Sequence, residues 1–522
     1  MSTRAVVVGA GMAGLATAIL LARDGFAVTV LEKNDRVGGR AGLLEVDGFR
    51  FDTGPSWYLM PSVFDHYFAL AGTSTEEQLD LRMLDPGYRV FPEPTADGAR
   101  SEPISIPYGQ DAVRELVAEL EPDALSAFDD YLETARRAMD MAEDVFLYNT
   151  FANPLSLVGE RVRRELPDLL TWLTTPLEKF VEESFTHPLL RQILAYQAVF
   201  LGTDPRRAPA IYHLMSRMDL VEGVQYPMGG FTAVVDALHG LAVEAGVEFR
   251  LEAEVTGIAV SHGWSRGVHW RDAAGKRHFE DVEVVVSAAD LHHTETQLLP
   301  ERYRSYPERV WQKTDSGPGA VLVMLGVEGE LPTLPHHSLL LTKEWGENFD
   351  AIFGTGVALP DPVSVYVCKP SATDPEVAPD GHENLFMLIP VKGDPAIGGG
   401  GADGRGDAEV ERIADLAIAQ LAEWTGAPDL ASRIVVRSTL GPADFVNDYN
   451  SWRGGILGPS HELAQSAMLR AGNASPKVKG LYYAGATVNP GVGVPMCLIS
   501  AELVLKHVRG DRSAGPLGVE NR

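Results

Sequence analysis

The sequence predicts an α/β fold in which a Rossmann-type domain is interleaved with an α+β domain that contains a mainly helical subdomain. Two observations support this prediction. The chain opens with a strand, a helix and a strand joined by glycines, and α/β signals return after a long helical stretch. The length of 522 residues also exceeds one core at about 150 residues per domain.

Composition narrows the class of protein. With 44 basic and 72 acidic residues the net charge is -28, which disfavours binding to nucleic acid phosphates, and 45% hydrophobic residues are ordinary for a globular protein. Cys368 and Cys497 are the two cysteines, so we expect no disulfide framework and a reducing cytoplasm. Glycines interrupt the apolar run at the N-terminus, which argues against a signal peptide, and we expect no membrane-spanning segment.

The first elements are a strand over Arg4 to Gly9, a helix over Met12 to Arg23 and a strand over Ala27 to Glu32. The glycines follow the pattern Gly9-x-Gly11-x-x-Gly14 in the first turn. In such a unit the first glycine makes the turn, the second lets the backbone approach a pyrophosphate, and the third lets helix and strand pack closely. Glu32, at the end of the second strand, is positioned to accept ribose hydroxyls. This context predicts a dinucleotide site.

A second glycine pair follows in Arg36-Val37-Gly38-Gly39-Arg40. It is placed to close over the same pyrophosphate, with Arg40 as the phosphate partner and Arg36 as a loop charge. The other residues that we assign to the cofactor in the first part of the chain are Ala10, Met12, Ala13, Lys33, Gly54, Pro55, Ser56 and Val255.

From about Gln110 to Leu220 the pattern is mainly helical, with apolar stripes such as Leu166, Leu169, Leu170 and Leu173. These stripes predict helix core, with a lipophilic substrate wall as the alternative. Further on we expect a helix over Ala233 to Ala245 and β-like runs at Glu248 to Val255, Val282 to Ala288, Ala320 to Leu325, Val363 to Cys368 and Leu385 to Val391. We expect Gly393 to Gly406 to be a flexible surface loop and the tail after His507 to be frayed.

Near the C-terminus, Leu481 to Ala486 predicts a strand that enters a turn, and Pro490-Gly491-Val492-Gly493-Val494-Pro495 precedes an apolar helix to His507. A helix that begins at Pro495 directs a partial positive charge at whatever binds above it. The residues that we assign to the cofactor here are Gly485, Ala486, Gly493, Val494 and Pro495.

These motifs resemble the flavoprotein group of amine oxidases, protoporphyrinogen oxidase, carotenoid desaturases and Rab GDP-dissociation inhibitors, and the implied cofactor is FAD. The run from Gly485 to Pro495 reads Gly-Ala-x-x-x-Pro-Gly-x-Gly-x-Pro, and Ala486 stands where many relatives have an acid. This is similar to the bacterial-type phytoene desaturases. The resemblance implies an FAD-binding domain over 1–75, 221–295 and 460–510, a mainly helical substrate and membrane subdomain over 76–220, a β-rich substrate domain over 296–459, and a flexible tail over 511–522.

The resemblance further implies desaturation of a long apolar carotenoid precursor, phytoene toward lycopene, by hydride transfer to flavin N5 and proton loss. Alternatives are dehydrosqualene desaturase, carotenoid isomerase or retinol saturase, and, less favoured, an amine oxidase or a non-enzymatic isoprenoid carrier. The motifs do not separate these alternatives, and the oligomeric state stays open.

No strong catalytic base is required by this chemistry, and the weak candidates in the helical stretch are Lys179, Glu183 and Arg191. We expect no metal site. The pairs His292-His293 and His336-His337 would point to opposite faces if they lie in strands.

A substrate this apolar must come from a bilayer, so we expect peripheral association with the inner face of the membrane. Our candidate docking surface is the helical region between about Leu155 and Met218. Its large apolar residues are Leu157, Trp172, Leu173, Phe180, Phe185 and Phe200, and its positive charges are Arg161, Arg163, Arg164, Arg206 and Arg207.

Overall fold

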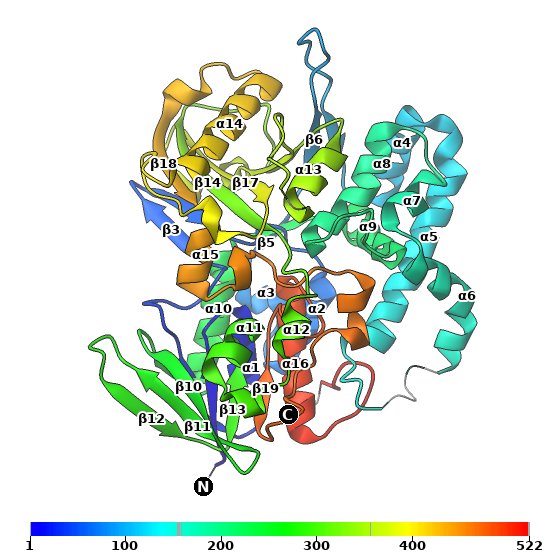
Figure 1. Cartoon of the computed structure of the whole chain (residues 1–522). Coiled ribbons are helices and arrows are strands. Elements are labelled where there is room, and N and C mark those ends of the chain that lie inside the picture. Colours follow the sequence, from blue (N-terminus) through cyan, green and yellow to red (C-terminus); the bar gives the residue numbers. More distant parts are fainter. Residues whose placement is uncertain (1, 154–156, 158, 355, 520–522) are drawn as a thin grey trace.

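The computed structural model describes residues 2–153, 157, 159–354 and 356–519. Figure 1 shows a parallel sheet at the lower end, a larger sheet with α14 (Ala408–Thr425) at the upper end, and a helical lobe at the right. Leu155, at one limit of the predicted docking region, lies outside the described residues.

The lower sheet has five parallel strands in the order β19-β13-β1-β2-β9. Their bounds are β1 Arg4–Val8, β2 Ala27–Leu31, β9 Glu248–Arg250, β13 Val284–Ser287 and β19 Leu481–Tyr483. The predicted opening strand, helix and strand are confirmed. Three distant stretches of chain meet in this sheet, since its strands come from residues 4–31, 248–287 and 481–483.

Helix α1 (Met12–Arg23) crosses this sheet in close contact with it. A Cβ atom at Gly14 would lie 2.0 Å from the carbonyl oxygen of Gly9, so only glycine allows the helix this near the strand. The helix is buried on nearly all sides because α10 (Phe231–Glu244) and α16 (Val494–Arg509) pack against it. Its almost uniformly apolar sequence fits that position.

The upper sheet has seven strands in the order β18-β14-β17-β16-β15-β6-β7. Their bounds are β6 Tyr88–Pro92, β7 Ile104–Ile106, β14 Gly319–Glu328, β15 His337–Leu341, β16 Val365–Cys368, β17 His382–Val391 and β18 Ile434–Leu440. All neighbours are antiparallel except β15 and β6. Helix α14 covers one face, and Phe49 and Phe51 pack on the other. Both faces are therefore buried, which explains the continuous apolar runs of β14 and β17.

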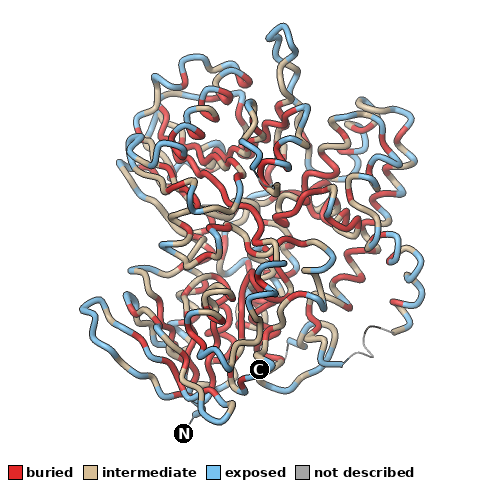
Figure 2. The backbone as a smooth tube through the Cα atoms, in the orientation of Figure 1, coloured by how far each residue is buried: buried red, intermediate tan, exposed pale blue. Residues whose placement is uncertain are grey.

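The helical lobe occupies most of residues 110–222. Its helices are α4 Gln110–Leu120, α5 Leu125–Met141, α6 Glu160–Thr174, α7 Leu177–Glu182, α8 Pro188–Ala195 and α9 Met215–Arg217, with the short helices η2 Ala142–Leu147, η4 Tyr196–Leu201, η5 Ala210–Leu214 and η6 Met218–Glu222. Figure 2 shows the buried backbone on the inner side of this lobe and the exposed backbone outside. The helical prediction is confirmed, although β6 and β7, which precede it, belong to the upper sheet.

Smaller elements complete the fold. An antiparallel three-stranded sheet projects beside the lower sheet, and the pairs β3/β4 and β5/β8 join other parts of the chain. The bounds are β3 Leu43–Val46, β4 Phe49–Asp52, β5 Leu81–Met83, β8 Gln225–Pro227, β10 Glu254–Ser261, β11 Trp264–Arg271, β12 Arg277–Asp281, α2 Pro61–Leu70, α3 Thr75–Gln78, α11 Leu291–His293, α12 Glu308–Trp311, α13 Trp345–Phe353 and α15 Pro442–Tyr449. The domain boundaries given above stay a prediction.

Two segments expected to be flexible make specific contacts, and their flexibility stays a prediction. The glycine run at 398–401 is held against β18, where Thr439 donates its backbone N–H to the Gly401 oxygen at 2.9 Å. A Cβ at Gly400 would lie 1.9 Å from the Thr439 oxygen, so glycine is needed here for close packing against β18. The described part of the tail packs on α16, because Lys506 Nζ donates to the Ser513 and Gly515 oxygens. Residues 520–522 lie outside the described residues.

Within the described residues, no helix is both long and apolar enough to cross a membrane.

Candidate active site

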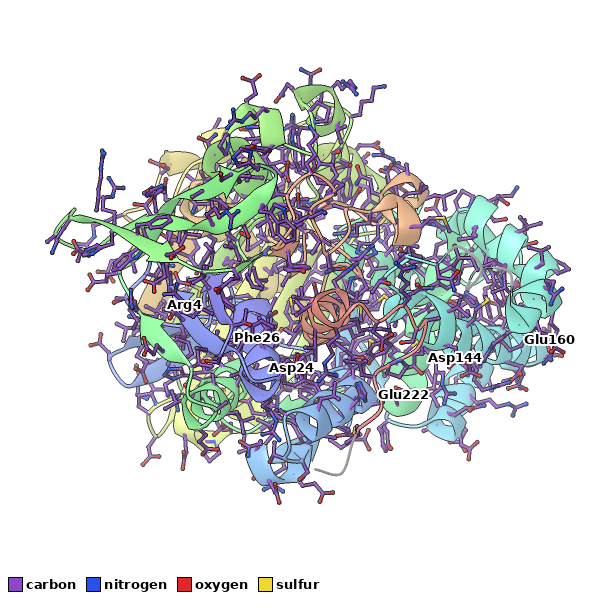
Figure 3. The ribbon with its side chains drawn as sticks, turned by 90° about the horizontal axis from the view of Figure 1, so that it is seen from below. Arg4, Asp24, Phe26, Asp144, Glu160 and Glu222 are labelled. Atoms are coloured by element: carbon purple, nitrogen blue, oxygen red, sulfur yellow. The ribbon has the colours of Figure 1, made fainter. Side chains whose placement is uncertain are left out.

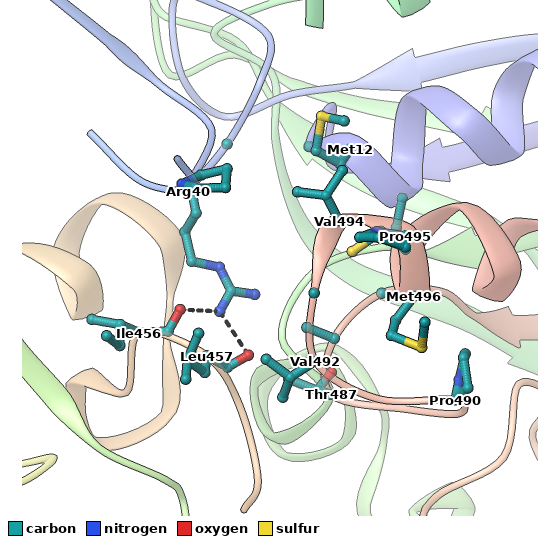
Figure 4. A pocket seen from close by; sticks show the side chains of 18 of the residues that line it. Met12, Arg40, Ile456, Leu457, Thr487, Pro490, Val492, Val494, Pro495 and Met496 are labelled. Atoms are coloured by element: carbon teal, nitrogen blue, oxygen red, sulfur yellow. Dashed lines mark hydrogen bonds between the residues drawn. The ribbon is translucent and has the colours of Figure 1, made fainter. Parts of the chain in front are cut away.

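A cavity of about 680 Å³ runs from the lower sheet into the helical lobe. Figure 4 shows one part of it, where loops from three regions of the chain converge. The residues assigned to a cofactor from the sequence line this cavity, with the exception of Ala10 and Gly14. They are Gly9, Gly11, Met12, Ala13, Glu32, Lys33, Gly38, Gly39, Arg40, Gly54, Pro55, Ser56, Val255, Gly485, Ala486, Gly493, Val494 and Pro495.

The two exceptions support the turn from behind. Gly14 provides the close crossing of helix and strand described above, which is the role predicted for it. Ala10 is fully buried and donates its backbone N–H to Oε2 of Glu32 at 2.7 Å. Neither residue faces the cavity, because both contribute to the packing that holds the turn in place.

The two glycine motifs lie side by side. Gly9 and Gly38 have positive φ angles of 95° and 110°, and Gly38 donates its N–H to the Ala10 oxygen at 2.9 Å. Helix α1 then starts at Met12, and no side chain caps it at Gly11. The first N–H groups of the helix therefore point into a cavity lined by glycines, an arrangement that fits a pyrophosphate.

Glu32 is 5% exposed and lies at the rim of this turn. Besides the bond from Ala10, its Oε1 accepts the N–H of Asn34 at 2.9 Å. These two bonds fix the carboxylate, and each oxygen keeps a lone pair that can accept a hydroxyl. The geometry fits the ribose role, which stays a prediction.

Arg40 reaches across the cavity, as Figure 4 shows. Its Nη1 donates to the carbonyl oxygens of Ile456 at 2.8 Å and Leu457 at 3.2 Å. The guanidinium thus connects the second glycine motif to the segment that follows α15. Its five N–H donors allow a phosphate contact in addition to these bonds, so the assigned role stays open to test.

The C-terminal turn has the backbone that its glycines predict. Gly485, Gly491 and Gly493 have φ angles of 113°, 141° and 120°. Helix α16 begins at Val494 with Pro495 in its first turn, and its N-terminus points into the cavity beside Met12 (Figure 4). The N-terminal end of this helix can stabilise negative charge on a bound group.

His461, which no motif in the sequence indicated, holds this turn. Its ring is buried, and its Nε2 accepts the backbone N–H of Val492 at 3.2 Å. The Nδ1 atom lies 2.9 Å from the Tyr212 hydroxyl, which lies 2.9 Å from Ser466 Oγ. Ser466 in turn donates to the Glu462 oxygen at 2.8 Å.

The donors and acceptors in this chain of hydrogen bonds follow from the groups at its two ends, the Glu462 carbonyl and the Val492 N–H. Because Ser466 donates to a carbonyl, it accepts from Tyr212, and Tyr212 accepts from His461 Nδ1–H. His461 is therefore the neutral Nδ1–H tautomer. Burial, with the positive charge of Arg470 as a smaller cause, holds its pKa well below the ordinary value. Both ring nitrogens are occupied, so His461 acts here as a support and not as a base.

Arg470 supports the same loop from the other side. It is 6% exposed, and its guanidinium donates to the oxygens of Ala486 at 2.6 Å and Val488 at 3.1 Å. His461 and Arg470 flank two short 3₁₀ helices, η14 (Leu463–Gln465) and η15 (Ala467–Leu469), and the sequence of this segment has no helix or strand periodicity. The only feature of the sequence that could have indicated them is that both are polar residues close to the glycine-rich C-terminal motif.

The far half of the cavity is apolar. Its wall contains side chains of α5, η2, α6, η4, η5 and α9, namely Met139, Ala142, Phe146, Leu147, Leu173, Phe200, Leu201, Leu214 and Met215. The rest of the wall comes from Leu463, Met468 and Leu469, which we call the mouth segment. Of the leucines in the stripe of α6 that we named, only Leu173 lines the cavity. The core interpretation is thus confirmed for Leu169, which is 5% exposed. Leu173 has the position that a lipophilic substrate wall requires, although its contact with substrate stays a prediction, and Leu166 and Leu170 are exposed.

The weak catalytic candidates lie outside the cavity. Lys179 and Glu183 are exposed on and just after α7, and Arg191 donates to the Phe185 oxygen. None of the three is among the described residues of the lining. Helices α7 and α8 turn these side chains away from the cavity, so they do not support a catalytic role.

The predicted docking surface also needs correction. Trp172 and Phe185 are 2% and 0% exposed and belong to the core. Arg161 is paired with Asp144 and Asp140, and Arg207 with Glu462 and Asp315. Figure 3 shows Asp144 and Glu160 on the helical lobe. Glu160 lies 3.7 Å from Arg164, so it offsets part of that charge as Asp144 does for Arg161. The aromatic residues face inward because a lobe of short helices needs them as its core.

Comparison with known proteins agrees with this geometry. Residues 12–504 match the family described as flavin containing amine oxidoreductase. The chain belongs to this family.

Two relatives and one solved structure illustrate the match. A carotenoid 3,4-desaturase of Haloarcula japonica is 42% identical over 95% of this chain and 96% of its own length. A phytoene desaturase of Fusarium fujikuroi is 32% identical over 97% of this chain and 89% of its own length. An oxidoreductase of Methanosarcina mazei has the same fold, with a TM-score of 0.59 and 16% identity over 96% of this chain and all of that one.

Family membership confirms two predictions. The chain is an FAD-dependent oxidoreductase, and its resemblance to carotenoid desaturases holds over nearly its whole length. A non-enzymatic carrier is excluded as the main function.

Proposed function

We propose that this enzyme desaturates a long apolar carotenoid precursor, with phytoene as the expected substrate. The observation that carries the proposal is the continuity of the cavity, which joins the glycine-rich turns to an apolar wall in the helical lobe. When bound, FAD supplies the oxidant that takes a hydride from the polyene. The protein's own task is to hold an unreactive hydrocarbon in place and exclude water.

The charges in the lining support a hydrocarbon substrate over an amine. The acidic residues of the described lining are Glu32, Glu254, Asp290 and Asp448, and they lie beside β2, β10, β13 and α15. The helices α5 to α9 contribute no carboxylate to the wall in the described residues. An apolar wall without a counter-charge favours a neutral polyene.

A second candidate is 3,4-desaturation of a carotenoid that is already conjugated. It is favoured by the higher identity to the Haloarcula japonica relative, 42% against 32% for the phytoene desaturase. Incubation of the purified FAD-loaded enzyme with liposomes that contain either phytoene or lycopene separates the two, with product spectra as the measurement. Products from phytoene support the first proposal, products from lycopene alone support the second, and none from either would overturn both.

We further propose that the enzyme takes its substrate from a bilayer through the mouth of the cavity. Leu463, Met468 and Leu469 line the cavity and are also 43%, 53% and 62% exposed. Exposed apolar side chains at the opening of an apolar cavity fit an interface with lipid. This mouth segment replaces the docking surface expected from the sequence.

Flotation with liposomes tests the mouth segment. A double change, Met468→Ser with Leu469→Ser, should reduce co-flotation and turnover of liposomal substrate while FAD stays bound. Leu251→Ser is the matched control, because Leu251 is 42% exposed but does not line the cavity. Equal flotation of both variants and the unchanged enzyme would contradict the proposal.

A further inference from the structure

A second cluster of chemistry-bearing side chains lies in the upper sheet. Strand β15 begins at His337, and the antiparallel pairing with β16 places Cys368 directly opposite it. Residues opposite each other in a sheet project from the same face. His336 precedes the strand, and its ring centroid lies 4.5 Å from that of His337.

This arrangement corrects the expectation that neighbouring histidines point apart. The alternation of faces applies only inside a strand, and His336 stands just outside β15. One donor atom of each histidine and the Cys368 sulfur all lie within 4.8 Å of one another. The three residues are 3%, 0% and 2% exposed.

The two histidine rings have the same hydrogen-bond pattern, with Nδ1 near a hydroxyl group and, among the residues that the structure describes, Nε2 without a partner. His336 Nδ1 lies 2.8 Å from Thr373 Oγ1, and His337 Nδ1 lies 2.8 Å from the Tyr366 hydroxyl. Within the described residues, the Nε2 atoms of both rings are buried without a partner. Histidines that bind metals show this pattern, with one nitrogen bonded to an oxygen that orients the ring and the other free for the ion.

We propose that His336, His337 and Cys368 form a three-coordinate site for Cu⁺. The ion would bind the free nitrogen of each imidazole and the Cys368 sulfur. Binding forms a sulfur–copper bond and releases the thiol proton, with no change of oxidation state. The donors would move closer together, because bonds to such an ion measure about 2.0–2.3 Å.

Two arguments favour Cu⁺ over Zn²⁺. Soft thiolate and imidazole donors suit Cu⁺, and one thiolate balances its single charge, so the buried site stays neutral. Zn²⁺ would leave a net positive charge and takes four ligands in structural sites. Among the described residues, the cluster of potential ligand atoms consists of His336, His337 and Cys368, so it offers three ligands and not four.

The site would lie directly behind the cavity wall. Trp57 and Tyr366 both line the cavity. The Trp57 ring stacks on His337 with centroids 4.9 Å apart, and the Tyr366 hydroxyl lies 2.6 Å from Ser56 Oγ. A bound ion would therefore fix His337 and, through it, the position of Tyr366.

Copper content and thermal stability test the site. The full chain is produced in copper-supplemented cells, purified without oxygen and assayed for copper. We expect one Cu⁺ per chain, a higher Tm than in the copper-free protein, and X-ray absorption that shows sulfur and nitrogen neighbours. Cys368→Ser should lose both the copper and the Tm shift. Cys497→Ser should keep them, because Cys497 lines the cavity, whereas Cys368 lies behind its wall.

Other outcomes would overturn the proposal. They are a wild-type protein with no more copper than Cys368→Ser, retention of Zn²⁺ but not Cu⁺, or loss of copper from Cys497→Ser. If Cys368→Ser does not fold, His336→Gln provides the second ligand variant, and the X-ray absorption measurement needs no variant. Copper content and Tm do not depend on carotenoid turnover, so this proposal and the proposed function can fail separately.

Discussion

The two halves of the cavity are built in different ways. The half near the lower sheet consists of backbone turns whose glycines are consecutive or nearly so, as in Gly9 to Gly14 and Gly485 to Gly493. The apolar half is assembled from single side chains of several helices and of the mouth segment, which lie between 248 residues (Met215 to Leu463) and 330 residues (Met139 to Leu469) apart in the chain. If the cavity binds cofactor and substrate as we propose, cofactor binding depends on local backbone geometry and substrate binding depends on packing.

The largest expected effect separates two glycines of the same motif. Gly11→Val should fold and lose FAD by at least about 100-fold in affinity, because a Cβ there meets its nearest atoms at 3.9 Å while the rest of the side chain fills the pyrophosphate space. Gly14→Val should yield little folded protein, since its Cβ would lie 2.0 Å from the Gly9 oxygen. Flavin absorbance and circular dichroism measure the two effects. A yellow Gly11→Val protein would contradict our placement of the site.

Two adjacent residues of α6, Trp172 and Leu173, allow a comparison of core and cavity wall in the helical lobe. Trp172→Ala should lower the free energy of unfolding by about 3–5 kcal/mol, because the ring is 2% exposed in the core. Leu173→Ala, which widens the cavity wall, should change turnover more than stability. Denaturant unfolding and product analysis distinguish them. Equal losses of stability would show that Leu173 is core and not wall.

His461 joins the two halves, so its replacement should affect both. His461→Phe keeps the ring but leaves the Val492 N–H without an acceptor, which should cost about 1–3 kcal/mol of stability. We also expect weaker FAD binding and a shifted flavin reduction potential, because the loop before α16 loses its support. His461→Gln can supply an acceptor again and should recover part of the loss. An unchanged potential in both variants would limit His461 to a structural role.

Glu32→Ala should weaken FAD binding by about 1–3 kcal/mol, the scale for loss of a charged acceptor. The N–H groups of Ala10 and Asn34 also lose their partner, so some stability is lost as well. Fluorescence titration gives the dissociation constant, and Glu32→Gln controls for charge. An unchanged dissociation constant in Glu32→Ala would reject the ribose assignment.

The smallest effect for a single step of its experiment, a change of one pH unit, is a pH dependence in the helical lobe. Burial raises the pKa of Asp219 from 3.8 to about 7, against the opposing bonds from Gln197 and Tyr88. Between these values the folded protein binds the proton and the unfolded chain does not, so stability falls as pH rises, by at most about 1.4 kcal/mol per unit. Asp219→Asn should remove this slope in unfolding experiments between pH 4 and 7. A slope that survives unchanged would show that Asp219 is not its source.

Prediction from sequence succeeded where neighbouring residues carry the whole requirement. The turn from Gly9 to Gly14 needs glycines at fixed spacings and a helix directly after it, and all of these stand in one short stretch. The same holds for the run from Gly485 to Pro495. The prediction of a docking surface failed for Trp172 and Phe185. An apolar stripe on a helix can face the core or the outside, and only the contacts within the lobe decide which face is buried.

The sequence by itself determined the cofactor turns and the class of fold, since φ angles, helix starts and strand runs follow from adjacent residues. Only the tertiary structure decided which polar groups meet. His461 and Val492 are joined through a loop, and β15 and β16 bring His337 beside Cys368. The cavity wall was decided in the same way, because hydrophobic burial acts between any apolar surfaces that packing brings together and has no signature in the order of residues.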